Sequence, residues 1–566
     1  MRGNFDYTGK LVKFMLRRER IIAAIWIIVL VLFSVALAPG LETMFPDNET
    51  RENIILIYDN PIMVSMMGPI FDIDGEFTTG TIYAGMMLLW VMIAVAIMNI
   101  FIVIRHTRAD EERWRAEVIR SLPVGRLSTV HAAMLTALII NTVLAVLTGL
   151  GLAATGTESM GFGGSMLYGA VLGASGLVFA AITAIFCQLS ASSSGAFGLS
   201  FLALGGSYML RAAGDVGNEV ISLISPFGLA QRSMVYAENE LMPLWGLLAI
   251  AFAFAALAYK FNSMRDLGQG FIPARMGRRE AKKSLLSSFG LSFRLLKNSI
   301  IVWTITLFML GASYGSIIGE IDRFVGDSPE YLTLVGLTPE LLDTLSDSDK
   351  ADMIVDGFGG FVTIMMTLIA LVPLLMFALK PKNEEIDGRA EGILSRSVSR
   401  QKYLAGYVII AFAMSIIVQL CTVVGLYGAA ESTVREGEIG EVAAILNPFV
   451  FEKLLAANFA YLPAMWLIIG LAVFIVGLLP KAGGVVWGYY GFICFMALIG
   501  NIPDLLPAWL SNLSPFNFIP EIRVTNFDLF PAAESSAVPL IVLTGIAAAL
   551  TVIGFIGYRK RDLITH

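Results

Sequence analysis

Long apolar runs of about 20 residues alternate with short polar segments along the whole chain. A run of this length crosses the hydrocarbon of a bilayer as a helix. The runs are continuous, whereas the strands of a membrane barrel alternate between apolar and polar residues, so the pattern predicts helices. Twelve spans are predicted, over residues 21–40, 81–104, 128–151, 166–189, 193–211, 242–261, 299–318, 358–379, 403–426, 459–479, 485–503 and 537–558.

Composition supports a membrane protein. Apolar residues make up 56% of the 566 residues and charged residues 15%, with a mean hydropathy of +0.75. A soluble chain of this length needs more charge to cover its surface, so the predicted fold class is an all-α membrane protein. Cys187, Cys421 and Cys494 lie inside apolar runs and suggest neither a disulfide nor a metal site.

The basic residues fix the predicted orientation. If the N-terminus is cytoplasmic, the cytoplasmic segments hold 31 of the 39 Lys and Arg residues. This positive-inside bias predicts a multi-pass protein of the cytoplasmic (inner) membrane with both termini in the cytoplasm. These segments are residues 1–20, 105–127, 260–297, 380–402, 481 and 559–566.

The chain is predicted to be a tandem repeat. A shift of 274 residues aligns 111–126 with 385–400, and eight of the sixteen positions are identical. Ser-Pro-Phe precedes the last span of each half, and Arg-Asp-Leu follows it. Six spans per half give both halves the same orientation, related by an axis along the membrane normal. The expected domains are an interfacial amphipathic helix (1–20), a first six-helix half (21–262), a basic linker with a second interfacial helix (263–297) and a second half (298–566).

The predicted spans contain almost no ionisable residues, which weakens the case for an ion-coupled secondary transporter. The sequence has no G-x-x-x-x-G-K-[ST] phosphate-binding loop. No catalytic, cofactor-binding or metal-binding set is predicted, and no nucleic-acid partner is expected. A lipid-handling membrane enzyme would need clustered acids, histidines or metal ligands, and the acids of this sequence are dispersed. A sensor partner of a two-component system would need a large extracytoplasmic domain, and the sequence predicts none. Energy for transport is therefore expected to come from a separate chain.

The repeated segment reads RAEVIRSLPVGR at 115–126 and RAEGILSRSVSR at 389–400. In the first copy Val118, Ile119 and Leu122 are predicted to form an apolar patch on a short helix, which Pro123 ends. A short helix with apolar side chains and a charged rim suits docking in a groove on a soluble partner. The alternative is a solvated loop whose charges only enforce the topology.

Four motifs carry a resemblance to a known family. They are E-x3-RAE-x-I-x-SLPVGR after the second span, SPFG at 225–228, RDLGQG at 265–270 and NPIMVSMMGP at 60–69. With the six-plus-six layout, the chain resembles the type-2 ABC exporter permeases, and within them the fused double permeases labelled exporters of polyketide antibiotics.

The resemblance implies that the loop after the second span of each half is a coupling helix that docks on a separate ATPase subunit. Two copies of that subunit would bind ATP and Mg²⁺, and this chain would bind neither. The second copy of the loop replaces Leu122-Pro123 by Arg396-Ser397 and contains Gly388 and Gly392, so the two docking sites are expected to be unequal. The implied coupling residues are Glu111, Arg115, Glu117, Ile119, Leu122 and Arg126, and then Glu385, Arg389, Glu391, Ile393 and Arg400.

The expected function is ATP-driven export of a hydrophobic or amphipathic, drug-like compound, with membrane lipids as neighbours. Export of a lipid or glycolipid is the first alternative, and ion-coupled secondary transport is the second. Methionine suits a pocket that accepts varied shapes, and SPF segments near the outer face suit an exit. The candidate substrate path contains Met86, Met87, Met365, Met366, Phe227 and Phe516.

Overall fold

The computed structural model describes residues 4–44, 51, 55, 61–73, 76–157, 159–266, 268–272, 280–317, 347–435, 450–499, 508–520 and 537–562. In these residues the chain is helical, and its only β-type pairing is an isolated bridge between Ile73 and Glu76. The chain divides into two compact units, Met1–Gly277 and Arg278–His566. This division falls inside the basic segment 263–297.

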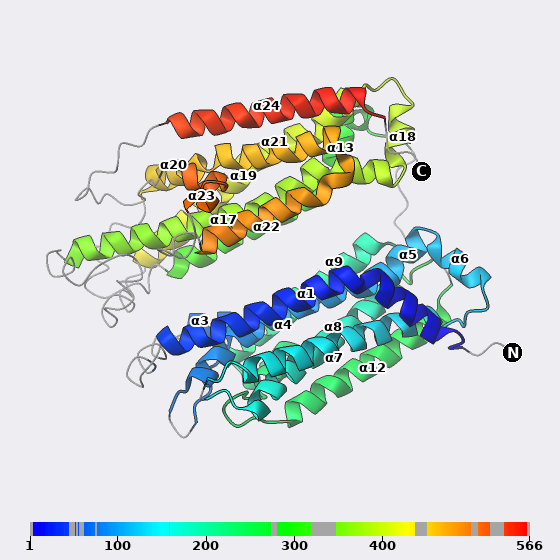
Figure 1. Ribbon diagram of the computed structural model, residues 1–566, viewed down its shortest axis with the longest axis vertical. Helices are drawn as coiled ribbons and strands as arrows, with labels where there is room; N and C mark the ends of the chain where they lie inside the picture. Colours follow the sequence, from blue (N-terminus) through cyan, green and yellow to red (C-terminus); the bar gives the residue numbers. More distant parts are fainter. Residues whose placement is uncertain are drawn as a thin grey trace. The chain divides into compact units, whose positions relative to one another are not determined.

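The first unit runs from blue to green in Figure 1. Its helices are α1 (Thr8–Met44), α3 (Pro61–Met67), α4 (Thr79–His106), α5 (Arg108–Glu112), α6 (Arg115–Ser121), α7 (Ser128–Ala153), α8 (Phe162–Leu189), α9 (Ser193–Val216), α10 (Glu219–Ile224), α11 (Pro226–Gln231) and α12 (Met242–Met264). The short helices α5 and α6 lie at one end of the long ones, the end at which α1 begins (Figure 1).

The second unit runs from green to red in Figure 1. Its helices are η1 (Lys283–Leu286), α13 (Ser288–Ile317), α17 (Asp347–Ile386), α18 (Arg389–Leu394), α19 (Arg400–Arg435), α20 (Phe451–Ala460), α21 (Leu462–Leu478), η3 (Pro480–Ala482), α22 (Gly483–Ile499), α23 (Ala508–Ser511), η4 (Pro515–Phe518) and α24 (Val538–Lys560).

Ten helical segments among the described residues are long and apolar enough to cross a membrane, five in each unit. The prediction of a helical multi-pass membrane protein is therefore confirmed. The other two predicted spans coincide with α9, which carries Arg211 and Asp215, and with α22, whose described part has 17 residues. Residues 318 and 500–503 of two predicted spans lie outside the described residues. Twelve spans stay a prediction.

The same pairs of long helices pack in both units. In the first unit α1 packs on α7, α4 on α8, and α8 on α12. In the second unit α13 packs on α19, α17 on α21, and α21 on α24. In each case the first span contacts the third, the second contacts the fourth, and the fourth contacts the sixth. These contacts bury the apolar faces of helices whose remaining surface is exposed Leu, Ile, Val and Phe, as in a helix bundle that faces lipid.

The N-terminal segment, expected as an interfacial helix, is helical from Thr8 and is continuous with the first span, so residues 8–20 and the span form one helix. Their apolar side chains Leu11 and Met15 are buried against Ala132 and Ala133 at the start of α7, and not against lipid. One side of this segment therefore has a partner inside the protein, while Phe14 stays exposed. The second expected interfacial helix likewise continues into the span from Ser288 as part of α13.

A buried arginine of α9 holds the short helix α3. The Arg211 guanidinium donates to the carbonyl oxygens of Val64, Ser65 and Met66 at 3.2, 2.6 and 3.2 Å. Those carbonyls lie in the last turn of α3, where backbone acceptors lack helical partners and cations are favoured. Asp215 balances the charge at 3.3 Å. This contact places the motif residues 61–67 against α9 and accounts for an ionisable residue at the end of a predicted span.

We predict that Gly554→Val separates α21 from α24. A Cβ atom on Gly554 would lie 2.6 Å from the carbonyl oxygen of Val473, and a backbone atom at that distance has no freedom to move aside. Overpacking of this kind costs about 1–3 kcal/mol. Thermal unfolding of the detergent-purified protein should show a lower melting temperature. Gly545→Val on the same helix is the control, because its Cβ meets open space. Equal melting temperatures for the two variants would contradict the close packing.

Candidate functional site

The repeated segment forms a short two-helix loop at the end of α4. Thr107 leaves helical geometry and separates α4 from α5. Trp114, with φ 60° and ψ 5°, then turns the chain into α6. Helix α6 ends at Leu122, which has extended backbone angles and precedes Pro123. The breaks at Thr107 and Trp114 fold the charged segment back toward the ends of the long helices.

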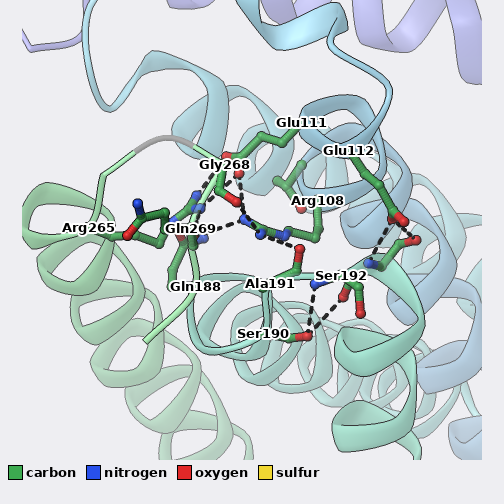
Figure 2. A network of polar contacts seen from close by, with 12 residues as sticks. Arg108, Glu111, Glu112, Gln188, Ser190, Ala191, Ser192, Arg265, Gly268 and Gln269 are labelled. Carbon is green, nitrogen blue, oxygen red and sulfur yellow. Dashed lines mark hydrogen bonds and ion pairs between the residues drawn. The ribbon is translucent and has the colours of Figure 1, made fainter. Parts of the chain in front are cut away.

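A buried ion pair holds this loop in place. Both carboxylate oxygens of Glu111 accept from Arg265, at 2.6 and 2.8 Å, and Oε2 also accepts from Arg108 at 2.7 Å (Figure 2). The side chains of Arg108, Arg265 and Glu111 expose 1, 4 and 10% of their surface. A two-pronged contact between a guanidinium and a carboxylate fixes direction as well as distance. The loop is therefore fixed to the segment that follows α12.

The two arginines also bind the backbone of a third junction. Arg108 donates to the carbonyl oxygens of Ala191 (2.5 Å), Gly268 (3.1 Å) and Gln269 (3.2 Å). Arg265 donates to Gln188 Oε1 at 2.9 Å and to the Gln269 carbonyl at 2.7 Å. Figure 2 shows these partners converging from the end of α4, from the α8–α9 connection and from the segment after α12. Carbonyl dipoles thus offset the second positive charge, and three helix junctions form one polar cluster.

The second unit repeats the core of this arrangement. Glu385 accepts from Arg561 at 2.8 Å through each of its carboxylate oxygens. In the first unit Arg126 donates to the Arg265 carbonyl at 3.1 Å, and in the second Arg400 donates to the Arg561 carbonyl at 2.5 Å. We call this Glu–Arg–Arg set the clamp. It comprises Glu111, Arg265 and Arg126 in the first unit and Glu385, Arg561 and Arg400 in the second.

The two units differ in the residue that supports the clamp from outside the set. A shift of 274 residues takes Arg108 to Lys382. A lysine ammonium lacks the planar five-donor fork with which Arg108 binds three carbonyls and Glu111 together. The second loop helix is also shorter, six residues in α18 against seven in α6.

A second matched contact supports each loop. Arg115 lies 3.5 Å from Asp110, and Arg389 lies 2.6 Å from Glu384, its equivalent under the same shift. Both arginines are more than half exposed, whereas both acids are buried. These pairs join the start of each loop helix to the helix that precedes it, α5 in the first unit and α17 in the second.

The structure divides the predicted coupling residues into two groups. Glu111 and Glu385 are enclosed in the clamp, and Ile119 and Ile393 pack into their own units. Ile119 therefore does not share an exposed patch with Val118 and Leu122, because the burial of Ala116 and Ile119 defines the inward face of α6. The exposed members are Arg115, Glu117, Leu122, Arg126, Arg389 and Glu391. Of these, the three arginines are bound within their own unit, Arg115 and Arg389 by an acid and Arg126 by the Arg265 carbonyl, which leaves Glu117, Leu122 and Glu391 as the candidates for outside contacts.

The candidate substrate-path residues are mostly packed within their own units. Phe227 is fully buried and stacks on Phe179 with ring centroids 5.0 Å apart. Ser225 is the N-cap of α11, the helix that contains Phe227. This SPF motif therefore forms a core element of the first unit. Met366 is fully buried as well. Phe516 in η4 is part-buried and contacts Tyr461. Three further residues of the set are part-buried and pack against the core of their unit, namely Met86, Met87 and Met365.

Sequence reasoning missed Arg108, Gln188 and Gln269. In the sequence, Arg265 and Arg561 served only as evidence of the repeat, because Arg-Asp-Leu follows the last span of each half. The sequence predicts no partner for them. The signal that links them to Glu111 and Glu385 is their joint recurrence, since an acid and a base that both return in an apolar protein are candidates for one ion pair. Leu267 and Leu563 of this motif lie outside the described residues.

We predict that Glu111→Gln destabilises the first unit. The change leaves Arg108 and Arg265 buried without their carboxylate, and removal of one partner from a buried pair costs about 3–5 kcal/mol. The melting temperature of the purified permease should fall clearly. Glu117→Gln is the matched control because Glu117 is exposed, and its expected effect is within about 0.5 kcal/mol. Similar melting curves for the two variants would show that the clamp does not hold the loop.

Comparisons with known proteins identify the family. A family model described as "Multidrug efflux system permease Rv1217c, C-terminal domain" matches residues 10–261 and 285–559, one segment in each unit. The multidrug efflux system permease protein Rv1217c of Mycobacterium tuberculosis (strain ATCC 25618 / H37Rv) is 32% identical over 567 residues, covering 99% of this chain and 96% of that protein. The chain with the two clamps thus belongs to the family of multidrug efflux system permeases.

Proposed function

We propose that this chain is the membrane subunit of an ATP-driven exporter of the type-2 ABC class. It moves hydrophobic or amphipathic, drug-like compounds out of the cell across the cytoplasmic membrane, and two copies of a separate ATPase subunit supply the energy. The observation that carries this proposal is the clamp. In each unit a short surface loop is bound by a buried ion pair to the end of the unit's last long helix.

The clamp gives the loop a mechanical connection to the membrane helices. In the first unit the polar cluster includes residues that adjoin the ends of α4, α8 and α12. A force on α6 is therefore passed to three long helices, because breaking the cluster would leave buried charges unpaired. Closure of an ATPase dimer against the two loops would bias the helices toward an outward-open state.

The comparisons support the permease role and the tandem layout. The relative carries the name of an efflux system permease, which implies further subunits. One family model matches both halves of the chain, which supports two related halves. With six spans in each half, the two halves would share one orientation and both termini would lie in the cytoplasm. The equivalent helix contacts in the two units point the same way.

Glu117 and Glu391 are the residues best placed to contact the ATPase subunits. They match under the 274-residue shift, and both are exposed. Residues buried in an ion pair recur because the fold needs them, whereas an exposed residue that recurs on both loops has no such requirement. A shared binding partner accounts for its return.

The proposal predicts that Glu117→Arg combined with Glu391→Arg uncouples transport from ATP. The variant should fold as the wild type does, because both positions are exposed. Reversing two interface charges places like charges together and should reduce ATP-driven efflux of a hydrophobic dye from proteoliposomes at least about tenfold. The measurement uses the permease reconstituted with the ATPase subunit that co-purifies with it.

Glu240→Arg is the control, because Glu240 is exposed and precedes α12, at the end opposite Arg265. It should leave ATP-driven efflux unchanged. Full efflux by the Glu117→Arg, Glu391→Arg variant would refute the coupling role. Efflux driven by a proton gradient without any ATPase would favour the ion-coupled alternative, and ATP-driven movement of labelled lipid in place of the dye would favour the lipid exporter.

A further inference from the structure

The outward side of α6 carries three exposed apolar side chains. Trp114, Val118 and Leu122 expose 71, 70 and 58% of their surface. Trp114 and Leu122 cap the two ends of α6, and Val118 lies in the helix between them, while Ala116 and Ile119 occupy the inward side. The exposed apolar surface of this loop is thus concentrated within one short helix and its caps. We call these three residues the stripe. Contiguous exposed apolar surface at a loop marks a site of interaction.

The backbone at Trp114 is a second sign of function. Its φ of 60° lies in the left-handed region, which an aromatic residue rarely adopts. The equivalent position in the second loop is Gly388, with φ 72°, so the turn requires this conformation in both loops. Glycine adopts it without steric cost. The first loop instead holds a strained tryptophan whose ring is exposed, and neither feature helps the unit to fold.

The second loop lacks the stripe, although a matching clamp holds it to its unit. The positions equivalent to Trp114, Val118 and Leu122 are Gly388, Gly392 and Arg396. The inward residues match, since Ala390 is buried and Ile393 packs on the core of its unit as Ala116 and Ile119 do. The two loops therefore sit on equivalent clamps but present different surfaces.

We propose that the stripe is the principal attachment of the permease to its ATPase, and that the second loop binds much more weakly. This rests on the proposed function. Two copies of one ATPase subunit present identical grooves, so an apolar stripe and a Gly-Gly-Arg surface must bind them with different affinities. Trp114 fills the groove, since tryptophan is enriched among the residues that dominate interface energies. Arg113 and Arg115 border Trp114 and are exposed, so an acidic rim on the groove complements them.

The position of α6 favours a soluble occupant over the membrane surface. Ile119 of α6 packs with Leu11 and Met15, which precede the basic residues Arg17, Arg18 and Arg20 along the continuous helix α1. Those arginines suit the level of the headgroups. Leu11 lies about 9 Å or more beyond Arg17 along the helix axis, at 1.5 Å per residue, on the cytoplasmic side. The stripe thus faces the compartment in which an ATPase subunit binds.

The test compares binding by two permease variants and the wild type. Trp114→Gly with Val118→Ser and Leu122→Ser converts the stripe to a polar surface, and glycine relieves the strain at position 114. This variant should keep the wild-type melting temperature or exceed it. Mass photometry of the full-length permease with increasing ATPase subunit should show two steps for the wild type, one tight and one weak. In the variant the tight step should weaken at least about tenfold, as expected when hot-spot side chains are lost.

The reciprocal variant is Gly392→Val with Arg396→Leu in the second loop, and it should tighten the weak step. Unchanged binding by the first variant, or two equal steps in the wild type, would overturn the stripe proposal while leaving the ATPase partnership intact. Failure of the wild type to bind any ATPase subunit would overturn both. Loss of permease dimers with normal ATPase binding would assign the stripe to contacts between permeases and also overturn the proposal.

Discussion

A carboxylate enclosed by two guanidinium groups determines where the first loop sits. Glu111 is nearly buried, and its burial is tolerable only because Arg108 and Arg265 both donate to its carboxylate. Arg265 belongs to a segment more than 150 residues away, and both arginines also need the carbonyls of the α8–α9 and post-α12 connections. All these partners are satisfied together in one arrangement of the helix ends. The cluster therefore makes the ends of α4, α8 and α12 move as one body or stay still.

Sequence predicted the helices of this protein well and the facing of individual side chains poorly. The apolar runs located ten described membrane helices because length and hydropathy are local properties. The burial of Leu11 and Met15 was not predicted, because they pack on Ala132 and Ala133, more than 100 residues away. Glu111 was expected to contact a separate ATPase subunit, whereas the structure pairs it with Arg265 of its own unit. A recurring residue can recur for the fold or for the partner, and only the contacts distinguish the two.

The pattern of matches between the two loops follows burial. Under the 274-residue shift, Ala116, Ile119 and Glu111 are retained at Ala390, Ile393 and Glu385, and all of these contact their own unit. The stripe positions all differ. Packing and ion pairing restrict what a buried position can hold, whereas the outward side is restricted only by what it binds. Glu117 and Glu391 are retained although exposed, which separates them from the residues that the fold explains.

The two loops have matching clamps but different outward surfaces, and this has a mechanical consequence under the proposed function. The clamp is present in both units, although only the first has Arg108 beside it, and the largest difference between the two loops lies in the surface that each presents to a partner. A stripe that holds one ATPase subunit throughout the cycle keeps the partner in place, and the weaker second contact is free to form and break as the ATPase dimer closes and opens. Because coupling requires that one contact differ in strength between the closed and open states, the weak loop, and not the strong one, would report ATP binding to the membrane helices.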